Sequence, residues 1–464
     1  MMIFMKIYNG MMRKEQIIYM RIKRNLLIGF CSMLLFNCSG ETYVGELSTD
    51  DDAPLVEPVP ILLSLGMSDF QILTRGSGEV NNGNDATFWD NVRFFVYAFN
   101  QDPETDLSKP WSEANEDNCL LDGYRNAGTN TQTSDYGKEV GVKKEDSNLM
   151  LFYPDESSQK IYYNMKNTNL PYNFFAYYLD DWKSECHREK DHIYYDVKID
   201  GRRDFMSAMA NPEVQKDKYE GNPYRDKIME RAFSAYSANH GLNPVFQLEH
   251  HLVLLRFVVC RPDETSDEYG TTIPELDPDL MVKKIEIRSK LKGRFTVAVS
   301  DPATSDETKP KRGISFDVDN QEYLYFELKK KNGDLIGDDG WCRVAECPRY
   351  TKEDITDKDK KYNRFVLGKD DEKNDRDSGT SLLVAPADSY WAKISLSIEK
   401  EGWNETPYNT VDVELKNKEG KDVFSAGNVY TIYLTVNSLS DIKSTVEAGT
   451  WSLGGDVNLT PDDE

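Results

Sequence analysis

The sequence predicts an all-β protein of sandwich type. Many short segments alternate apolar and polar residues, two further segments are apolar throughout, and the chain contains 26 Tyr, 20 Phe and 7 Trp. Alternation with a period of two is typical of strands with one buried face, whereas continuous apolar runs suit strands covered on both faces. So many aromatic residues also exclude a chain that is disordered throughout. We therefore expect packed sheets joined by long loops.

Length and charge narrow the classes of protein further. The chain has 464 residues, with 56 Lys plus Arg against 80 Asp plus Glu, and a formal net charge of -24. A surface this acidic lacks the basic footprint that nucleic-acid binding requires. No nucleic-acid partner is expected. The length suggests about two or three domains.

The N-terminal region has the pattern of an export signal. Basic residues at positions 21, 23 and 24 precede an apolar run over residues 26–36, which is too short for a membrane-spanning helix of about 20 residues. A cysteine follows directly, in Phe36-Asn37-Cys38. We predict a signal peptide over residues 1–37, with Met20 as its start and Cys38 as a lipidated residue. An ordinary secretory signal with an incidental cysteine is the alternative.

The segment after Cys38 contains a candidate cleavage loop. Aspartates at 50–52 and prolines at 54, 58 and 60 indicate an extended tether, which leads into the apolar segment 61–65. Thr74-Arg75-Gly76-Ser77-Gly78 then offers one arginine on a Gly/Ser loop, a suitable substrate for a trypsin-like protease. Cleavage would detach the segment that begins at Cys38. An ordinary loop that is never cut is the alternative.

The remaining elements follow from the same patterns. Residues 92–99 and 252–259 are apolar on both faces and predict central strands. Residues 225–239 predict a helix, and residues 115–148 and 352–379 are rich in polar or charged residues and predict exposed loops. Half-buried strands are expected over 282–288, 295–299, 394–398, 411–415 and 430–436.

Catalytic or metal-binding patterns are scarce. The five histidines form no His-Glu-x-x-His motif, and no Cys-x-x-Cys pair is present. Cys342 and Cys347 are close enough in sequence for a small disulfide, which the sequence leaves open. Acidic residues over 370–377 could bind Ca²⁺, although they match no EF-hand spacing and are interrupted by basic residues. We expect no catalytic, metal or cofactor site, and no enzyme.

Several segments, in their order and spacing, resemble the fimbrillins of Bacteroidia. The resemblance starts with the lipoprotein signal and Thr74-Arg75-Gly76, and it covers nearly the whole mature chain. The segments that carry it are 88–99 (FWDNVRFFVYAF), 204–208 (DFMSA), 245–250 (VFQLEH), 285–287 (IEI), 293–296 (GRFT), 424–430 (FSAGNVY), and the late Trp451 with 454–456 (GGD).

The resemblance implies a fold and an assembly mechanism. Fimbrillins have two transthyretin-like β-sandwich domains in tandem, here expected over 76–242 and 243–464. They are exported as lipoproteins and lose an N-terminal strand to a trypsin-like or Arg-directed protease. Residues 38–75 would be the lipid-anchored propeptide, with Arg75-Gly76 as the processing bond and 61–65 as the core of the displaced strand. Residues 446–459 would be the candidate donor strand.

The expected function is therefore a structural one at the cell surface. The resemblance implies a stalk or tip subunit of a type V pilus, which reaches the outer membrane through its lipid anchor and joins other pilin subunits by strand insertion. A lipoprotein of the same fold that stays anchored and binds glycan or host protein is the second hypothesis. A hydrolase that uses paired carboxylates is the third, which nothing in the sequence specifies.

Overall fold

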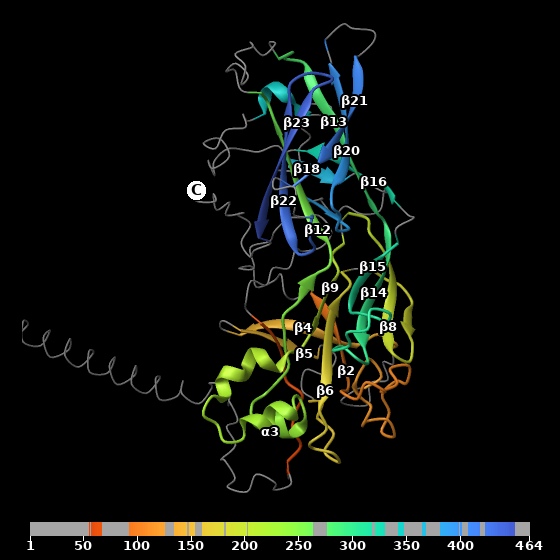
Figure 1. Cartoon of the computed structure of the whole chain (residues 1–464), viewed down its shortest axis with the longest axis vertical. Coiled ribbons are helices and arrows are strands. Elements are labelled where there is room, and N and C mark those ends of the chain that lie inside the picture. The colour runs from red at the N-terminus through yellow and green to blue at the C-terminus, as the bar shows by residue number, and fades with distance from the viewer. Residues whose placement is uncertain are drawn as a thin grey trace, which may run out of the picture. The chain divides into compact units, whose positions relative to one another are not determined.

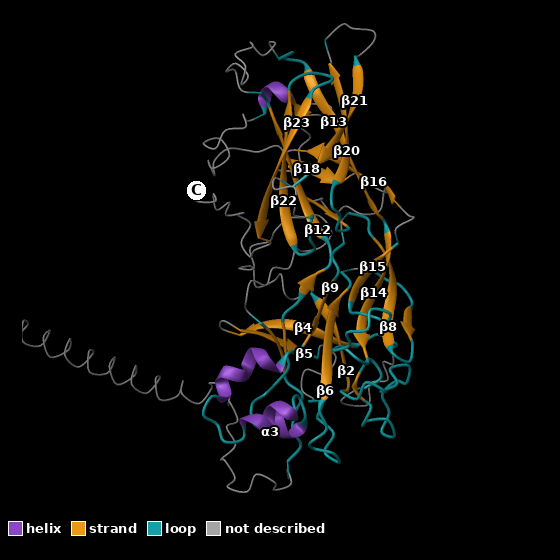
Figure 2. Cartoon of the chain, viewed as in Figure 1, coloured by secondary structure: helices purple, strands orange, loops and turns teal. Residues whose placement is uncertain are grey.

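In the computed structural model, β-strands dominate the described part of the chain, as Figure 2 shows, which confirms the predicted all-β class. The chain divides into two compact units, and every described strand lies in the unit formed by Pro54–Ala238 and Leu242–Glu464. No helix among the described residues is long and apolar enough to cross a membrane. The structure describes residues 55, 57–66, 92–125, 134–145, 148–153, 160–180, 182–201, 203–262, 276–317, 321–329, 342–347, 364–367, 381–398, 400, 407–417 and 423–450.

The first sheet contains strands from residues 63–250, most of them in the N-terminal half of the chain (Figure 1). Its pairs are antiparallel, except that β1 runs parallel to β10. A short strand, β3 (Cys119–Leu121), pairs with one end of β2. In spatial order the sheet contains β10 (Val245–Phe246), β1 (Leu63–Leu65), β5 (Asn148–Phe152), β4 (Lys138–Glu145), β2 (Arg93–Asn100), β6 (Tyr172–Tyr178), β9 (Met206–Met209) and β11 (Glu249–His250).

The second sheet joins segments that are far apart in sequence. Its strands β7 and β8 precede the predicted domain boundary at 242/243, whereas β14 and β15 follow it. Only Leu291 separates β14 from the preceding strand β13, which belongs to another sheet. The boundary itself stays a prediction. The sheet contains β15 (Gly313–Phe316), β14 (Lys292–Val299), β8 (His192–Lys198) and β7 (Cys186–Arg188).

Two further sheets pack face to face in the C-terminal half, which is the predicted sandwich arrangement. One contains β19 (Ser381–Val384), β12 (Val253–Cys260), β22 (Asn428–Val436) and β23 (Ile442–Thr450). The other contains β18 (Arg364–Leu367), β16 (Gln321–Lys329), β13 (Leu280–Lys290), β20 (Tyr390–Ile398) and β21 (Tyr408–Leu415), with β17 (Cys342–Arg343) beside β13. The transthyretin-like form of these sandwiches stays a prediction.

Hydrophobic cores explain why two strands are apolar on both faces. Alternate residues of β2 belong to different cores: Phe94 and Val96 pack with the helical segments, and Tyr97 and Phe99 pack with the second sheet. In the same way β12 contributes to the C-terminal core and, through Leu254, to the core shared by the first two sheets. The prediction that 92–99 and 252–259 form central strands is confirmed.

The predicted helix over 225–239 is present but interrupted. The structure has α3 (Arg225–Glu230) and α4 (Ala235–Asn239), and between them Phe233 has a positive φ of 57°, which ends the helical path. Phe233 is fully enclosed in the core, so its packing stabilises this conformation. The described part also has the 3-10 helices η3 (Pro212–Tyr219) and η4 (Val344–Glu346).

Two predicted loops contain strands. Residues 115–148 were expected to form an exposed loop, yet they include β3 and β4 and the first residue of β5. In β4, the apolar residues Val140 and Val142 are buried, and most of the other residues of the strand are Lys or Glu. With only two apolar residues, the alternation of apolar and polar residues is weak in the sequence. Residues 352–379 include β18, and their other residues lie outside the described part of the chain.

Candidate functional site

The predicted site residues fall partly outside the described residues. Cys38, Arg75 and Gly76 are among those that the structure does not describe. The predicted displaced strand, 61–65, is described, and its last three residues form β1. The donor segment 446–459 is described only as far as residue 450, where β23 ends.

β1 is an inner strand of the first sheet, with one neighbour on each side. On one side Leu63 pairs with Leu151 of β5, and on the other side Leu65 pairs with Phe246 of β10. The amide of Ser64 donates to the carbonyl oxygen of Pro244 over 3.2 Å, and that of Gly66 donates to Phe246 over 2.8 Å. The chain segment that precedes the predicted cleavage bond therefore connects β10 to the rest of the sheet.

Side chains of this segment alternate between the core and the surface. Val59, Ile61, Leu63 and Leu65 are each at most 7% exposed and belong to the core beneath the first sheet, whereas Leu62 is 43% exposed. Each buried aliphatic side chain contributes about 1.5–3 kcal/mol to the free energy of folding. We call residues 59–66 the N-terminal strand segment, and the space between β5, β10 and residues 161–163 the acceptor groove.

The upstream end of the N-terminal strand segment pairs with a short extended stretch, residues 161–163. The amide of Ile61 donates to Ile161 over 2.8 Å, and the amide of Tyr163 donates to Val59 over 2.9 Å. Between them Pro60 faces Tyr162 in an isolated antiparallel bridge. Proline has no amide hydrogen and cannot donate. The hydrogen bonds of this pairing involve the residues on either side of Pro60, so proline at this position removes none of them. The predicted tether thus becomes part of the sheet by residue 59.

Arg125 lies against the opposite side of residues 161–163. Its guanidinium donates to the carbonyl oxygen of Tyr162 over 2.7 Å and forms an ion pair with Glu116 at 2.9 Å. It also donates to the carbonyl oxygen of Leu120. The side chain is 10% exposed, and burial lowers the pKa of Arg125 from its ordinary value. Sequence reasoning missed this residue, because nothing in its neighbourhood distinguishes it from a loop arginine.

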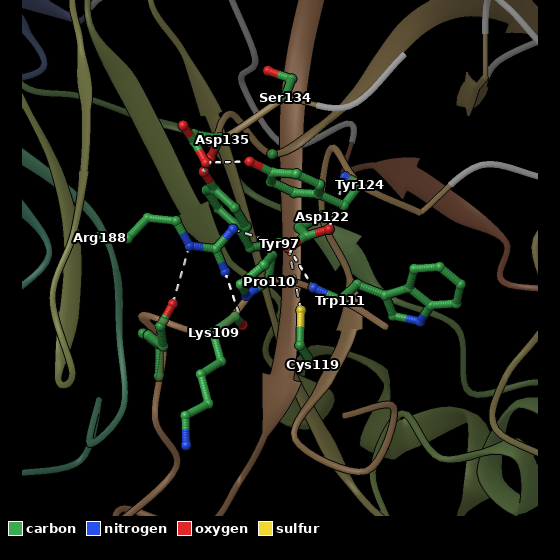
Figure 3. Close-up of polar contacts among 12 residues, drawn as sticks. Tyr97, Lys109, Pro110, Trp111, Cys119, Asp122, Tyr124, Ser134, Asp135 and Arg188 are labelled. Carbon is green, nitrogen blue, oxygen red and sulfur yellow. Dashed lines mark hydrogen bonds and ion pairs between the residues drawn. The ribbon is translucent and has the colours of Figure 1, made fainter. Parts of the chain in front are cut away.

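A buried polar network fixes the loop that carries Arg125 (Figure 3). Arg188, on β7, forms an ion pair with Asp122 at 2.9 Å, and both side chains are at most 7% exposed. The Asp122 carboxylate also accepts the backbone amides of Trp111 and Tyr124 at 3.0 and 2.9 Å. The Arg188 guanidinium donates further to the carbonyl oxygens of Leu107 and Lys109.

The charge of Arg188 is well compensated. Burial by itself lowers the pKa of the Arg188 guanidinium, but its neighbours Tyr97 and Asp122 more than offset this effect and raise the pKa. The guanidinium also lies over the Tyr97 ring, 5.7 Å from its centroid. Burial raises the pKa of both nearby thiols, Cys119 and Cys186, which keeps them protonated and weakly nucleophilic.

The candidate donor segment begins in an edge strand. β23 pairs antiparallel with β22 along its whole length, so that Val446 faces Ile432 and Ala448 faces Tyr430. Val446 is buried in the C-terminal core. In the structure, the first part of the candidate donor segment therefore completes its own sheet.

Groups that resemble catalytic residues have structural contacts. Ser207 Oγ lies 2.7 Å from His251 Nε2 and accepts a hydrogen bond from Arg312 at 2.8 Å, but Ser207 is fully buried. Burial, followed by the charges of Arg312 and His250, lowers the pKa of His251 to about 3. The carboxylate of Asp204 contacts His250 at 2.6 Å. Among the described residues, no three His, Cys, Asp or Glu side chains form a group that could hold a metal ion.

Only one of the two cysteines of the possible disulfide has a described side chain. Cys347 is buried, and its thiol donates to the carbonyl oxygen of Arg343 over 3.4 Å. The side chain of Cys342 lies outside the described part of the chain, so a bridge between Cys342 and Cys347 stays an open question.

No family model and no curated protein matches the chain. The chain is similar to the solved structure of a candidate cell adhesion protein from Bacteroides uniformis, with 11% identity and a TM-score of 0.39 over 85% of this chain and 99% of that one. It is also similar to the fimbrial anchor protein Mfa2 from Porphyromonas gingivalis, with 10% identity and a TM-score of 0.26 over 85% and 99%. A fimbrilin (FimA) from the same organism has 9% identity and a TM-score of 0.30 over 86% and 99%. At these TM-scores the likeness does not identify a function.

Proposed function

We propose that this chain is a structural subunit of a type V pilus, in the stalk or as a tip or accessory subunit, with a role in adhesion. The sequence resemblance to fimbrillins suggests this function. The observation that carries it is the position of β1, an inner strand of the first sheet that belongs to the segment before Arg75. An inner strand from a removable segment is what assembly by strand exchange requires.

The proposed assembly begins with export. The chain is lipidated at Cys38 and reaches the outer membrane, and a trypsin-like or Arg-directed protease cuts Arg75-Gly76. The cut releases residues 38–75, which include the N-terminal strand segment. Its departure would leave the facing edges of β5 and β10 unpaired and four apolar positions open to water. Such a groove is a ready site for strand addition by a neighbouring subunit.

The donor would come from residues 446–459 of that neighbour. Because 446–450 already pair within β23, the inserting part would be mainly 451–459. In an extended chain one face of this part carries Trp451, Leu453, Val457 and Leu459, with Gly455 between them. This spacing is compatible with a groove whose natural occupant presents apolar side chains at 59, 61, 63 and 65.

A second candidate function is a lipoprotein of the same fold that keeps its N-terminal strand, stays anchored at Cys38 and binds glycan or host protein. The complete pairing of β23 with β22 favours it, because a donor that completes its own sheet has less chain free to exchange. Neither candidate has a catalytic role.

The two candidates predict different mature chains. The N-terminal residue and intact mass of the protein on the cell surface should be determined with and without an inhibitor of trypsin-like proteases. We expect a chain that starts at Gly76 and occurs in heat-sensitive species of high mass. Arg75→Ala should abolish both the cleaved chain and the species of high mass. Arg288→Ala, at an exposed position of β13, should leave the cleavage and the species of high mass unchanged. An uncut, lipid-modified monomer would refute the polymerising function and support the anchored lipoprotein.

A further inference from the structure

One side of the acceptor groove has two unequal walls. The odd-numbered residues of the N-terminal strand segment face β5 and residues 161–163 on this side, whereas the amides of Ser64 and Gly66 donate to the β10 side. The β5 wall is part of a sheet, because β5 pairs in turn with β4. Residues 161–163 are different: Tyr162 takes part in an isolated bridge to Pro60, and no described strand pairs with this stretch. Its described backbone bonds to the N-terminal strand segment are those of Ile161 and Tyr163. These bonds are lost when the segment departs.

Arg125 takes the place that a neighbouring strand would occupy on the far side of this wall. Its guanidinium reaches the carbonyl oxygen of Tyr162 at 2.7 Å, which lies in the middle of the wall. Glu116 and the carbonyl oxygen of Leu120 hold the same guanidinium, and the Trp111 ring lies under it with its centroid 5.3 Å away. A buried arginine held by several acceptors is rigid, so it can fix the backbone it contacts.

A second contact fastens the end of the same wall. The side-chain amide of Asn164 donates to Asp117 over 2.6 Å, and its oxygen accepts the backbone amide of Lys166 over 2.9 Å. Asn164 is 2% exposed. Both fastenings, Arg125 and the Asp117 partner of Asn164, therefore come from the same loop region, residues 116–125, which includes the short strand β3.

That loop is anchored independently of the N-terminal strand segment. The buried pair of Asp122 and Arg188 ties it to β7, in the second sheet (Figure 3). In the described part of the chain, the hydrogen-bond and ion-pair partners of Arg125, Asn164 and Asp122 lie outside residues 59–66. The support should thus survive the departure of the strand.

We propose that Arg125 is a positioning residue that keeps the 161–163 wall of the acceptor groove extended and in register, so that the groove can receive the strand of a second copy of this chain. The inference rests on the proposed pilus function. Without Arg125, residues 161–163 would lose the described hydrogen bonds of their backbone on both sides once the N-terminal strand segment left. Only the contact of Asn164 with Asp117 would still fasten their end, and an incoming strand would have to order the wall again.

The test is amide hydrogen exchange in the full, uncut chain. Arg125→Gln should accelerate exchange of the amides of Ile61 and Tyr163, which bridge the wall, by about tenfold or more, because it removes hydrogen bonds from a charged group. The amides of Ser64 and Gly66, which bond to the β10 side, should change less than about twofold. Glu116→Gln, a milder variant that keeps the arginine, should accelerate the same two amides to a smaller extent.

The matched control is Arg312→Gln. Like Arg125, Arg312 is an arginine with an acidic partner, Glu249, although its side chain is 22% exposed; it contacts Ser207 of β9 at the other end of the sheet. Arg312→Gln should leave the exchange rates of all four amides unchanged. Equal acceleration of all four amides by Arg125→Gln would show a role in general stability only, and no acceleration would show no role in the wall. Either result would overturn the inference.

A separate readout tests the link to assembly. If the wild-type chain forms high-mass species, Arg125→Gln should form fewer of them than Arg312→Gln at equal amounts of cleaved protein; equal yields would overturn the role in assembly. If the wild-type chain forms none, the pilus function fails, while the exchange result still decides whether Arg125 supports the wall.

Discussion

The amide of Tyr163 donates a hydrogen bond to the carbonyl oxygen of Val59 over 2.9 Å, and this contact brings the segment before Arg75 into the sheet two positions before the predicted strand core at residue 61. Val59 itself is 7% exposed. The segment predicted to leave is therefore held by backbone bonds to three different parts of the chain: residues 161–163, β5 and β10.

The N-terminal strand segment offers a matched pair of leucines. Leu63 is 2% exposed and Leu62 is 43% exposed, although they are neighbours in sequence. Leu63→Ala should lower the free energy of unfolding of the uncut chain by about 2–5 kcal/mol, because it opens a cavity in the core. Leu62→Ala should change it by no more than about 0.5 kcal/mol. Urea denaturation of the two variants checks this, and equal losses would contradict the placement of Leu63 in the core.

The ion pair of Arg188 and Asp122 should be sensitive to the loss of one partner. Asp122→Asn leaves the guanidinium of Arg188 buried without its counter-charge, which typically costs about 3–5 kcal/mol. Arg93 and Glu139 form an ion pair whose side chains are 36% and 41% exposed, so Glu139→Gln should cost at most about 1 kcal/mol. Thermal or urea unfolding compares the two; a small effect at Asp122 would mean that the pair is open to water.

Stability should fall in mild acid because of His251. Its pKa is about 3 in the folded chain, against an ordinary value of 6.5, through burial and then through the charges of Arg312 and His250. As the pH falls from about 6.5 to about 3, the unfolded chain takes up a proton that the folded chain does not. The free energy of unfolding should therefore fall over this window, by at most about 1.4 kcal/mol per pH unit from this group.

Urea titrations at several pH values, analysed as differences between variants, isolate that contribution. His251→Gln should reduce the fall in the free energy of unfolding between pH 6.5 and 3, because the variant side chain does not titrate. His187→Gln, at a partly exposed histidine on β7, is the matched control and should reduce this fall in the free energy of unfolding by a smaller amount. Identical profiles for wild type and His251→Gln would show that His251 is accessible to protons in the folded chain.

Gly137 should not tolerate a side chain. A Cβ atom there would lie 2.9 Å from the backbone nitrogen and oxygen of Val96, on the adjacent strand β2, which cannot move without disturbing the sheet. Gly137→Ala should therefore lower the free energy of unfolding by about 1–3 kcal/mol. At Gly66 the nearest atom is the flexible Cγ of Gln247 at 3.2 Å, so Gly66→Ala should cost clearly less. Equal effects would argue against the close approach of Gly137 to β2.

Some elements could be predicted because their signal is local. Alternation along 411–415 and continuous apolar runs over 92–99 and 252–259 reflect the environment of each face of a strand, and each face is visible in the order of the residues. Residues 295–299, 394–398 and 430–436 also lie in strands, but the prediction that they are half-buried is wrong. Their intervening residues Thr296, Ser397 and Tyr433 are buried as well, because sheets or loops cover both faces. β4 was not predicted, because its two buried valines are surrounded by lysines and glutamates, and such a composition is equally typical of an exposed loop. The helix over 225–239 was predicted without its interruption, which depends on the packing of Phe233.

The sequence by itself determined the all-β class, the acidic surface and the apolar character of residues 61–65, since these follow from composition and from a period of two. Only the tertiary structure decided that residues 63–65 lie between β5 and β10, and that Arg125, in a loop region held by Asp122 and Arg188, supports residues 161–163. The reason is physical: strand pairing and buried ion pairs join residues that are tens of positions apart. Their partners are selected by the folded core, and no local pattern records that selection.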